Sequence, residues 1–232
     1  SAQIASSISQ ADFDEDPTQA AFTWKASQGY EDNNYSLIGL SHTYKASTKL
    51  KNTTSLFYTY LDHYEPRPFN ILDEYTNGYG LRTLFSGNLN ISENLLSYTF
   101  GGELYKDEYA WGTFQNLYEE NNGNGSLQGD RLSKNKEFRS QVNSFATISY
   151  PFTTKLTAQL GLNVNKTQYD FRDLFNSGGT NTSANRNFKA LFLPSLDVNY
   201  SITATSQLYA NISRGFSNPS LEETLTPEGI IN

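Results

Sequence analysis

"LTAQLGLNV", residues 156–164, decides the fold class of this chain. Its apolar residues occupy every second position, and the positions between them hold the small or polar residues Thr157, Gln159, Gly161 and Asn163. Successive side chains of a β-strand point to opposite faces, whereas a helix needs a period near 3.6. The stretch therefore predicts a strand with one apolar face and one polar face.

The same period recurs along the chain. In "LDVNYSITA", residues 196–204, the apolar or aromatic positions again alternate with Asp197 and other polar residues, and 79–91 and 96–104 behave alike. The pattern predicts an all-β, antiparallel, up-and-down meander of about nine strands. They lie at about 21–29, 35–45, 53–62, 79–90, 95–115, 138–150, 155–170, 188–203 and 207–214.

The connections between these strands differ in length in a regular way. Tight turns at 46–52, 92–94, 151–154 and 205–207 alternate with polar loops at 62–78, 116–137 and 171–187 and a shorter one near 30–34. Alternate connections of an up-and-down meander lie at the same end, so one end should hold tight turns and the other long loops. Outer-membrane β-barrels have short periplasmic turns and longer extracellular loops.

Composition excludes several classes of protein. The chain has 232 residues, a net charge of −7 and a pI of about 4.9, so we expect no nucleic-acid partner, because phosphate binding depends on clustered Lys and Arg. It has no cysteine, and therefore no disulfide or thiolate metal site. No apolar run is long enough for a membrane helix, but barrel strands need apolar residues only at alternate positions.

We divide the chain into an irregular acidic segment, 1–20, and a partial barrel wall with long extracellular loops, 21–232. A soluble or surface β-rich binding or adhesin module is the alternative, because its strands also alternate. Two features favour the membrane barrel. The polar strand faces carry many small uncharged residues, as a wet lumen would, and aromatic residues gather near strand ends, where a membrane girdle would lie.

One stretch resembles a known family. "FLPSLDVNYSITATSQLYANISRGFSNPSLEETLTPEG", residues 192–229, is similar to the mid-barrel signature of TonB-dependent outer-membrane receptors. Two weaker resemblances lie at 95–108 and 143–171, so the likeness covers about 80–216. The residues that match the signature are Leu208, Tyr209, Ala210, Arg214, Gly215, Phe216, Pro219 and Glu222.

The resemblance implies a barrel of about 22 strands, of which this chain would supply about nine or ten, with the N-terminal plug domain absent. It implies a location in the outer membrane of a Gram-negative bacterium and active uptake of a scarce ligand, such as an iron–siderophore complex, a glycan or a peptide. The expected partners are the plug domain, the rest of the barrel, the lipid bilayer and the TonB complex, which acts through the plug.

The end of the chain fits the same interpretation. If the strand at 207–214 runs outward, residues 215–232 form an extracellular loop whose return strand is missing. We therefore expect an open, curved sheet rather than a closed barrel, because closure requires the first and last strands to pair.

We expect no catalytic residue, cofactor or metal, and hence no enzyme. The chain has two histidines, and neither lies in a hydrolase-like motif. His63 lies near Asp62 and Glu65, but we interpret this group as the polar root of a loop rather than a metal site. The candidate residues that line the lumen or bind ligand are Arg82, Glu103, Tyr109, Trp111, Asp197, Tyr209 and Arg214.

Two of these candidates have a competing interpretation. Tyr109 and Trp111 belong to "EYAWGTFQNLYEE", residues 108–120, where aromatic residues alternate with carboxylates. Aromatic rings at the outer rim would stack on a ligand, but a membrane girdle or packing within a loop explains them as well.

Overall fold

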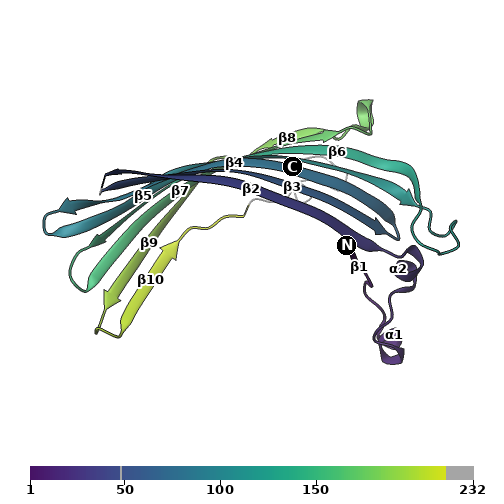
Figure 1. Ribbon diagram of the computed structural model, residues 1–232, viewed down its shortest axis with the longest axis horizontal. Helices are drawn as coiled ribbons and strands as arrows, with labels where there is room; N and C mark the ends of the chain where they lie inside the picture. The colour runs from purple at the N-terminus through teal and green to yellow at the C-terminus, as the bar shows by residue number, and fades with distance from the viewer. Residues whose placement is uncertain (48, 218–232) are drawn as a thin grey trace.

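A computed structural model describes residues 1–47 and 49–217 as one antiparallel sheet that curves into an arch (Figure 1). Its strands are β1 (Ala2–Gln3), β2 (Tyr30–Ser47), β3 (Leu50–Arg67), β4 (Asn70–Ile91), β5 (Asn94–Asn116), β6 (Gln128–Pro151), β7 (Leu156–Asp173), β8 (Ala184–Asn187), β9 (Leu191–Ser201) and β10 (Gln207–Ser213). The helices are α1 (Gln10–Glu15), α2 (Phe22–Ser27) and the 3₁₀ turn η1 (Gly178–Thr180).

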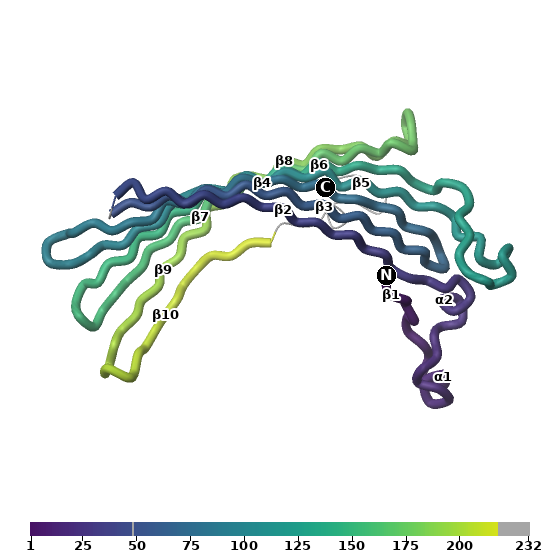
Figure 2. The backbone as a smooth tube through the Cα atoms, viewed as in Figure 1, coloured from purple at the N-terminus to yellow at the C-terminus, as the bar shows by residue number. Residues whose placement is uncertain are grey.

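The strands follow each other in sequence order, β1-β2-β3-β4-β5-β6-β7-β9-β10. The short strand β8 pairs with β7 beyond the end of β9. Within the described residues no pairing joins β10 to β1 or β2, and Figure 2 shows the arch open between them. The prediction of an open meander, part of a barrel, is confirmed.

The two faces of the sheet differ in chemistry. Leu160 on β7 lies opposite Ile148 on β6 and Leu196 on β9, and this register continues across the sheet as the apolar face. On the other side of β7, Gln159 lies opposite Asp197, and this side is the polar face. In a soluble protein the apolar face of the sheet would be buried, but here it is exposed, since Leu160 is 55% exposed.

The apolar face is apolar over only part of each strand. On β5 the outward positions run Tyr98, Phe100 and Leu104 and then change to Lys106 and Glu108. On β7 the change from apolar to charged residues occurs at Lys166. In the register Lys166 lies opposite Val142 on β6, and Val142 lies opposite Leu104 on β5. The apolar half of the sheet next to the short turns, the apolar belt, is the part suited to lipid.

The two kinds of connection lie at opposite ends of the sheet (Figure 1). The short β2–β3, β4–β5, β6–β7 and β9–β10 turns share one end, and the β5–β6 and β7–β9 connections share the other. This confirms the predicted sorting of ends except at the β3–β4 connection, which is a short turn at the end of the long connections.

The prediction of a loop at 62–78 is wrong. Strands β3 and β4 continue through it and meet in a turn of Pro68 and Phe69. Both faces are polar there, so the period of two is hidden, yet the ladder persists. Arg67 Nη2 donates to Asn70 Oδ1 across the turn at 2.6 Å. The proposed loop near 30–34 likewise belongs to β2.

The prediction of a strand at 21–29 is also wrong, because helix α2 occupies it. Gln28 adopts a left-handed conformation, φ 50°, and its backbone N–H donates to Lys25 and Trp24, which ends the helix. Gly29 follows because a Cβ there would lie 2.4 Å from the Trp24 ring. None of the helices in the described part of the chain is long and apolar enough to cross a bilayer.

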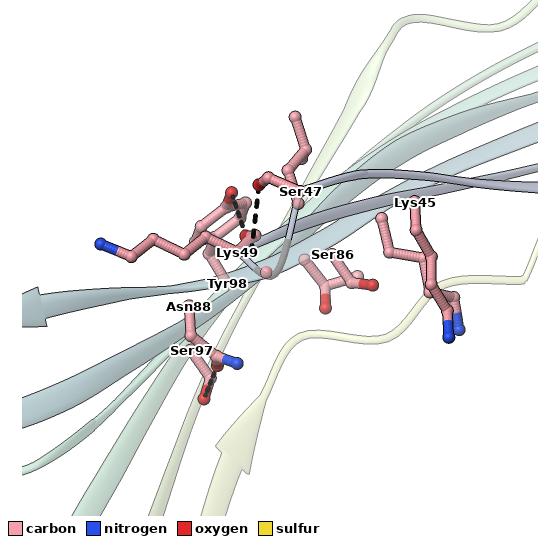
Figure 3. Close-up of a pocket in the computed structure, with 11 residues that line it drawn as sticks. Lys45, Ser47, Lys49, Ser86, Asn88, Ser97 and Tyr98 are labelled. Carbon is pink, nitrogen blue, oxygen red and sulfur yellow. Dashed lines mark hydrogen bonds between the residues drawn. The ribbon is translucent and has the colours of Figure 1, made fainter.

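The β2–β3 turn folds back onto the sheet. The carbonyl oxygen of Lys49 accepts hydrogen bonds from the Asn88 backbone N–H at 3.2 Å and from Tyr98 Oη at 3.3 Å (Figure 3). Gly87 permits this approach, since a Cβ there would lie 1.9 Å from the same oxygen. The turn is thereby held over β4 and β5.

Candidate functional site

The polar face beyond the apolar belt carries a buried charged group. Arg139 on β6 lies opposite Asp107 on β5, and its Nε and Nη2 donate to the two carboxylate oxygens at 2.8 and 2.6 Å. Glu137 lies two residues earlier on β6, with Oε1 3.8 Å from Arg139 Nε. Both carboxylates are buried, so the arginine stabilises two acids that burial would otherwise destabilise.

Three aromatic rings form a ridge beside this charged group. Tyr109 and Trp111 on β5 stack with ring centroids 4.6 Å apart, and Trp111 stacks on Phe171 of β7 at 5.8 Å. Glu137 lies between Tyr109 and Phe171 in the strand register. We call Tyr109, Trp111 and Phe171 the aromatic ridge. Phe171 is buried and supports the ridge, so the partly exposed rings of Tyr109 and Trp111 are the ones suited to hold a flat ligand.

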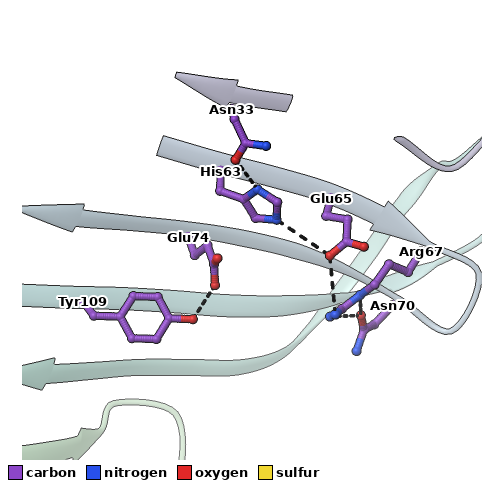
Figure 4. Close-up of polar contacts among 7 residues, drawn as sticks. All are labelled: Asn33, His63, Glu65, Arg67, Asn70, Glu74 and Tyr109. Carbon is purple, nitrogen blue, oxygen red and sulfur yellow. Dashed lines mark hydrogen bonds and ion pairs between the residues drawn. The ribbon is translucent and has the colours of Figure 1, made fainter. Parts of the chain in front are cut away.

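Further polar contacts continue the site toward the β3–β4 turn (Figure 4). Tyr109 Oη donates to Glu74 Oε2, so the ridge is anchored to β4. His63 Nδ1 lies 2.6 Å from Asn33 Oδ1, and Glu65 lies between His63 and Arg67, 3.6–3.7 Å from each. Figure 4 thus shows two separate groups on the polar face, one that joins β2 to β4 and one that joins β4 to β5.

His63 therefore belongs to a chain of paired side chains. Its ring faces an amide on one side and a carboxylate on the other. In the described residues no group of three or more His, Asp or Glu side chains is arranged to hold a metal ion. Asp62, which the sequence places next to it, projects from the other face because side chains alternate.

The structure brings some of the predicted site residues together. Arg82 and Glu103 are cross-strand neighbours on the polar face, with Nε 3.9 Å from Oε2. Tyr109 and Trp111 are the stacked pair of the ridge. All four point to the polar face by register, and their roles in ligand binding stay predictions.

The other predicted residues lie away from this group. Asp197 on β9 accepts a hydrogen bond from Asn211 Nδ2 at 2.5 Å. Tyr209 on the edge strand β10 is 85% exposed. Arg214, Gly215 and Phe216 follow β10, and the Arg214 backbone N–H donates to the Pro194 carbonyl at 3.1 Å. The predicted motif residues Pro219 and Glu222 lie outside the described residues.

Sequence reasoning missed Asp107, Arg139, Glu137, Glu74 and Phe171. Each lies on the polar face of a strand whose apolar belt is visible in the sequence, so continuing the alternation beyond the belt would have placed them. Their partners would still be unknown, since Arg139 and Asp107 are 32 residues apart and meet only through the register.

The connection after β7 is organised by one carboxylate. The side chain of Asp173 accepts from the backbone N–H of Phe175, Asn176 and Thr182, and from the Asn176 and Thr182 side chains, at 2.9–3.2 Å. Burial alone would raise the pKa of this group, but these hydrogen bonds outweigh it and hold the pKa far below the usual value. Asp173 lies beyond the apolar belt, in the row of Asn135 and Trp111.

Comparison with known proteins agrees with this geometry. Residues 4–230 match the family model "TonB dependent receptor-like, beta-barrel". Similar solved structures include the ferric citrate transporter FecA, with 15% identity and a TM-score of 0.77 over 90% of this chain and 30% of that one. No curated protein sequence matches.

Two further structures have the same fold. The alcaligin outer-membrane receptor FauA from Bordetella pertussis has 12% identity and a TM-score of 0.68 over 88% of this chain and 32% of its own. The siderophore receptor PiuA from Acinetobacter baumannii has 10% identity and a TM-score of 0.65 over 80% and 32%. The chain therefore spans about a third of the length of the structures it resembles.

This chain belongs to the TonB-dependent receptor-like β-barrel family. Members of the family are receptors and transporters of the Gram-negative outer membrane, not enzymes. The apolar belt is accordingly the lipid-facing side of a barrel wall, and the polar face lines the lumen.

Proposed function

We propose that this chain is part of the wall of a receptor that actively takes up a scarce ligand, such as an iron–siderophore complex, across the outer membrane. The plug domain of such a receptor would close the lumen, and the TonB complex would supply energy through it. The wall itself performs no chemistry, and its part is to hold the ligand above the plug.

The observation that carries this proposal is the aromatic ridge, with the buried Asp107–Arg139 pair beside it on the polar face. Buried, mutually paired charges hold the side chains around them in fixed positions. Rings fixed in this way lose little entropy when they bind a ligand, so they form a preorganised surface.

The charged residues of the polar face affect which kind of ligand the receptor would bind. Three arginines of the polar face on β3 to β6 each lie within 4 Å of a carboxylate, so an anionic ferric chelate would have to compete for them. A glycan would stack on the partly exposed rings of Tyr109 and Trp111 and would need no free charge. The glycan is therefore the second candidate. The three pairs are Arg67–Glu65, Arg82–Glu103 and Arg139–Asp107.

The test is uptake by cells that express the full receptor. Radioactive iron bound to a panel of citrate, catecholate and hydroxamate chelators, and labelled oligosaccharides, would be offered with the TonB complex active or inactivated. Uptake of one member of the panel only with active TonB supports the proposal. Uptake that persists without TonB contradicts it.

A matched pair of variants ties uptake to this site. Trp111→Ala removes the centre of the aromatic ridge, and losing one stacked ring should weaken binding by about 1 kcal/mol or more, which is about fivefold in Kd. Leu162→Ala alters the lipid-facing side of β7 and should leave Kd unchanged. Equal ligand affinity in both variants would separate the ridge from binding.

A further inference from the structure

Two lysines oppose each other at the short-turn end of the sheet. Lys45 on β2 and Lys51 on β3 are direct cross-strand partners on the polar face. Like charges in this position repel each other and destabilise the pair. Lys49, in the turn between the two strands, adds a third cation.

The described residues offer these cations no counter-charge. Along the register from Lys51 the next side chains on the polar face are Ser86 on β4 and Thr99 on β5, which are hydroxyls. Among the described residues, no carboxylate lies within ion-pair distance of Lys45, Lys49 or Lys51. The three ammonium groups are therefore unpaired in this part of the barrel.

The lysines line a hollow of about 680 Å³ that also includes Ser86, Ser97 and Thr99. In Figure 3, Lys45 and Lys49 extend away from each other, with Ser86 between them. The hydrogen bonds that hold the Lys49 carbonyl over Gly87 lie on the apolar face, to which Gly87 and Tyr98 belong, and they fix the turn that carries Lys49 beside the hollow. It is thus an open hollow lined by cations and hydroxyl groups.

We propose that this hollow binds an acidic segment of the plug domain at the periplasmic mouth of the barrel. The short turns mark the periplasmic end, Lys45 and Lys51 project from the face that lines the lumen, and Lys49 lies in the turn between them. The inference rests on the plug of the proposed function, but it does not depend on which ligand is transported.

The strands that line the hollow distinguish this partner from a neighbouring barrel strand. A strand added at the free edge of β2 would lie beside Lys45. It would not reach Ser97 and Thr99, which lie on β5, three strands away from that edge. An extended acidic segment that crosses the lumen wall would contact all four strands and would neutralise the repulsion between Lys45 and Lys51.

Zero-length carbodiimide cross-linking tests the proposal in the full receptor in outer-membrane vesicles. The reagent joins a lysine amine only to a carboxylate in contact with it, and mass spectrometry identifies both residues. We expect Lys45, Lys49 or Lys51 to be linked to Asp or Glu of the plug. Lys106, an exposed lysine on the other face of β5, should give no link to the plug.

Substitutions separate charge from structure. Replacing all three lysines by Gln should abolish these links and make the plug more sensitive to added protease. Replacing them by Arg should abolish the links, since Arg does not react, but should keep the plug protected. Links only to barrel carboxylates, or none to the plug, would overturn the proposal, as would a protected plug in the Gln variant. Transport could continue in every case, so these outcomes do not decide the proposed function.

Discussion

Arg139 holds Asp107 through two parallel hydrogen bonds across neighbouring strands, at 2.8 and 2.6 Å. The Asp107 side chain is 2% exposed, so water does not replace the guanidinium if it is removed. The arginine stacks near the Tyr109 ring, with its central carbon 6.0 Å from the ring centroid. One side chain thus links the buried charges to the aromatic ridge.

Removing this link should destabilise the wall above the belt. Arg139→Ala leaves the Asp107 carboxylate buried without its partner, which should cost about 2–3 kcal/mol in the free energy of unfolding. Urea unfolding of the full receptor in lipid vesicles measures it. The double variant with Asp107→Ala should recover part of the loss, and additive losses would contradict the pairing.

The assignment of lipid and lumen faces is tested on two neighbouring residues of β7. Leu160→Arg places a charge in the middle of the apolar belt and should cost about 2–4 kcal/mol in folding free energy in a bilayer. Gln159→Arg, one residue away on the polar face and opposite Asp197, should cost much less. The assignment would be wrong if the order of the two costs were reversed.

The Asp173 carboxylate should keep the connection after β7 ordered over a wide pH range. Its pKa is lower in the folded chain than its unfolded value of about 3.9, so its stabilising effect is complete above that value. The effect is lost as the pH falls through the lowered pKa. Hydrogen exchange of residues 174–183 should therefore show constant protection from pH 7 to about 4.

Substitution checks the same carboxylate at neutral pH. Asp173→Ala should remove protection of 174–183, because three backbone N–H groups lose their acceptor. Asp170→Ala is the control, since that partly exposed carboxylate bonds only to Arg172 among the described residues. Similar exchange in both variants would show that Asp173 does not organise the connection.

Gly87 should be intolerant of any side chain. Gly87→Ala puts a Cβ 1.9 Å from the Lys49 carbonyl oxygen, so the turn must move, and overpacking of this kind costs about 1–3 kcal/mol. Gly179→Ala has nothing within 4 Å of the added Cβ and should be neutral. Thermal unfolding of both variants of the full receptor compares them directly.

The sequence predicted the part of the fold that contacts lipid. In 156–164 the bilayer requires an apolar residue at every second position, and this requirement leaves a visible period. Beyond the belt both faces meet water, so the residues of 62–78 show no period although they continue as strands. At 21–29 the sequence predicted a strand, but Phe22–Ser27 form a helix that ends at Gln28 in a left-handed conformation, φ 50°.

The candidate site was less accessible to sequence reasoning. Arg82 and Glu103 were both expected to face the lumen, and the register makes them neighbours. The pairing of Asp107 with Arg139 depends on how β5 and β6 align, and the sequence of the connection between them does not reveal that register. Alternation along one strand fixes a face, whereas contact between strands needs the register of both.

The length of the strands has a consequence for where the wall lies relative to the bilayer. Strand β5 has 23 residues. A strand of that length, at about 3.4 Å per residue and tilted by about 40°, rises about 60 Å, more than twice the apolar band of about 25 Å. The hydrogen-bonded sheet of the wall therefore extends well beyond the bilayer. The stacked rings of β5 lie on this raised part of the wall, beyond the apolar belt.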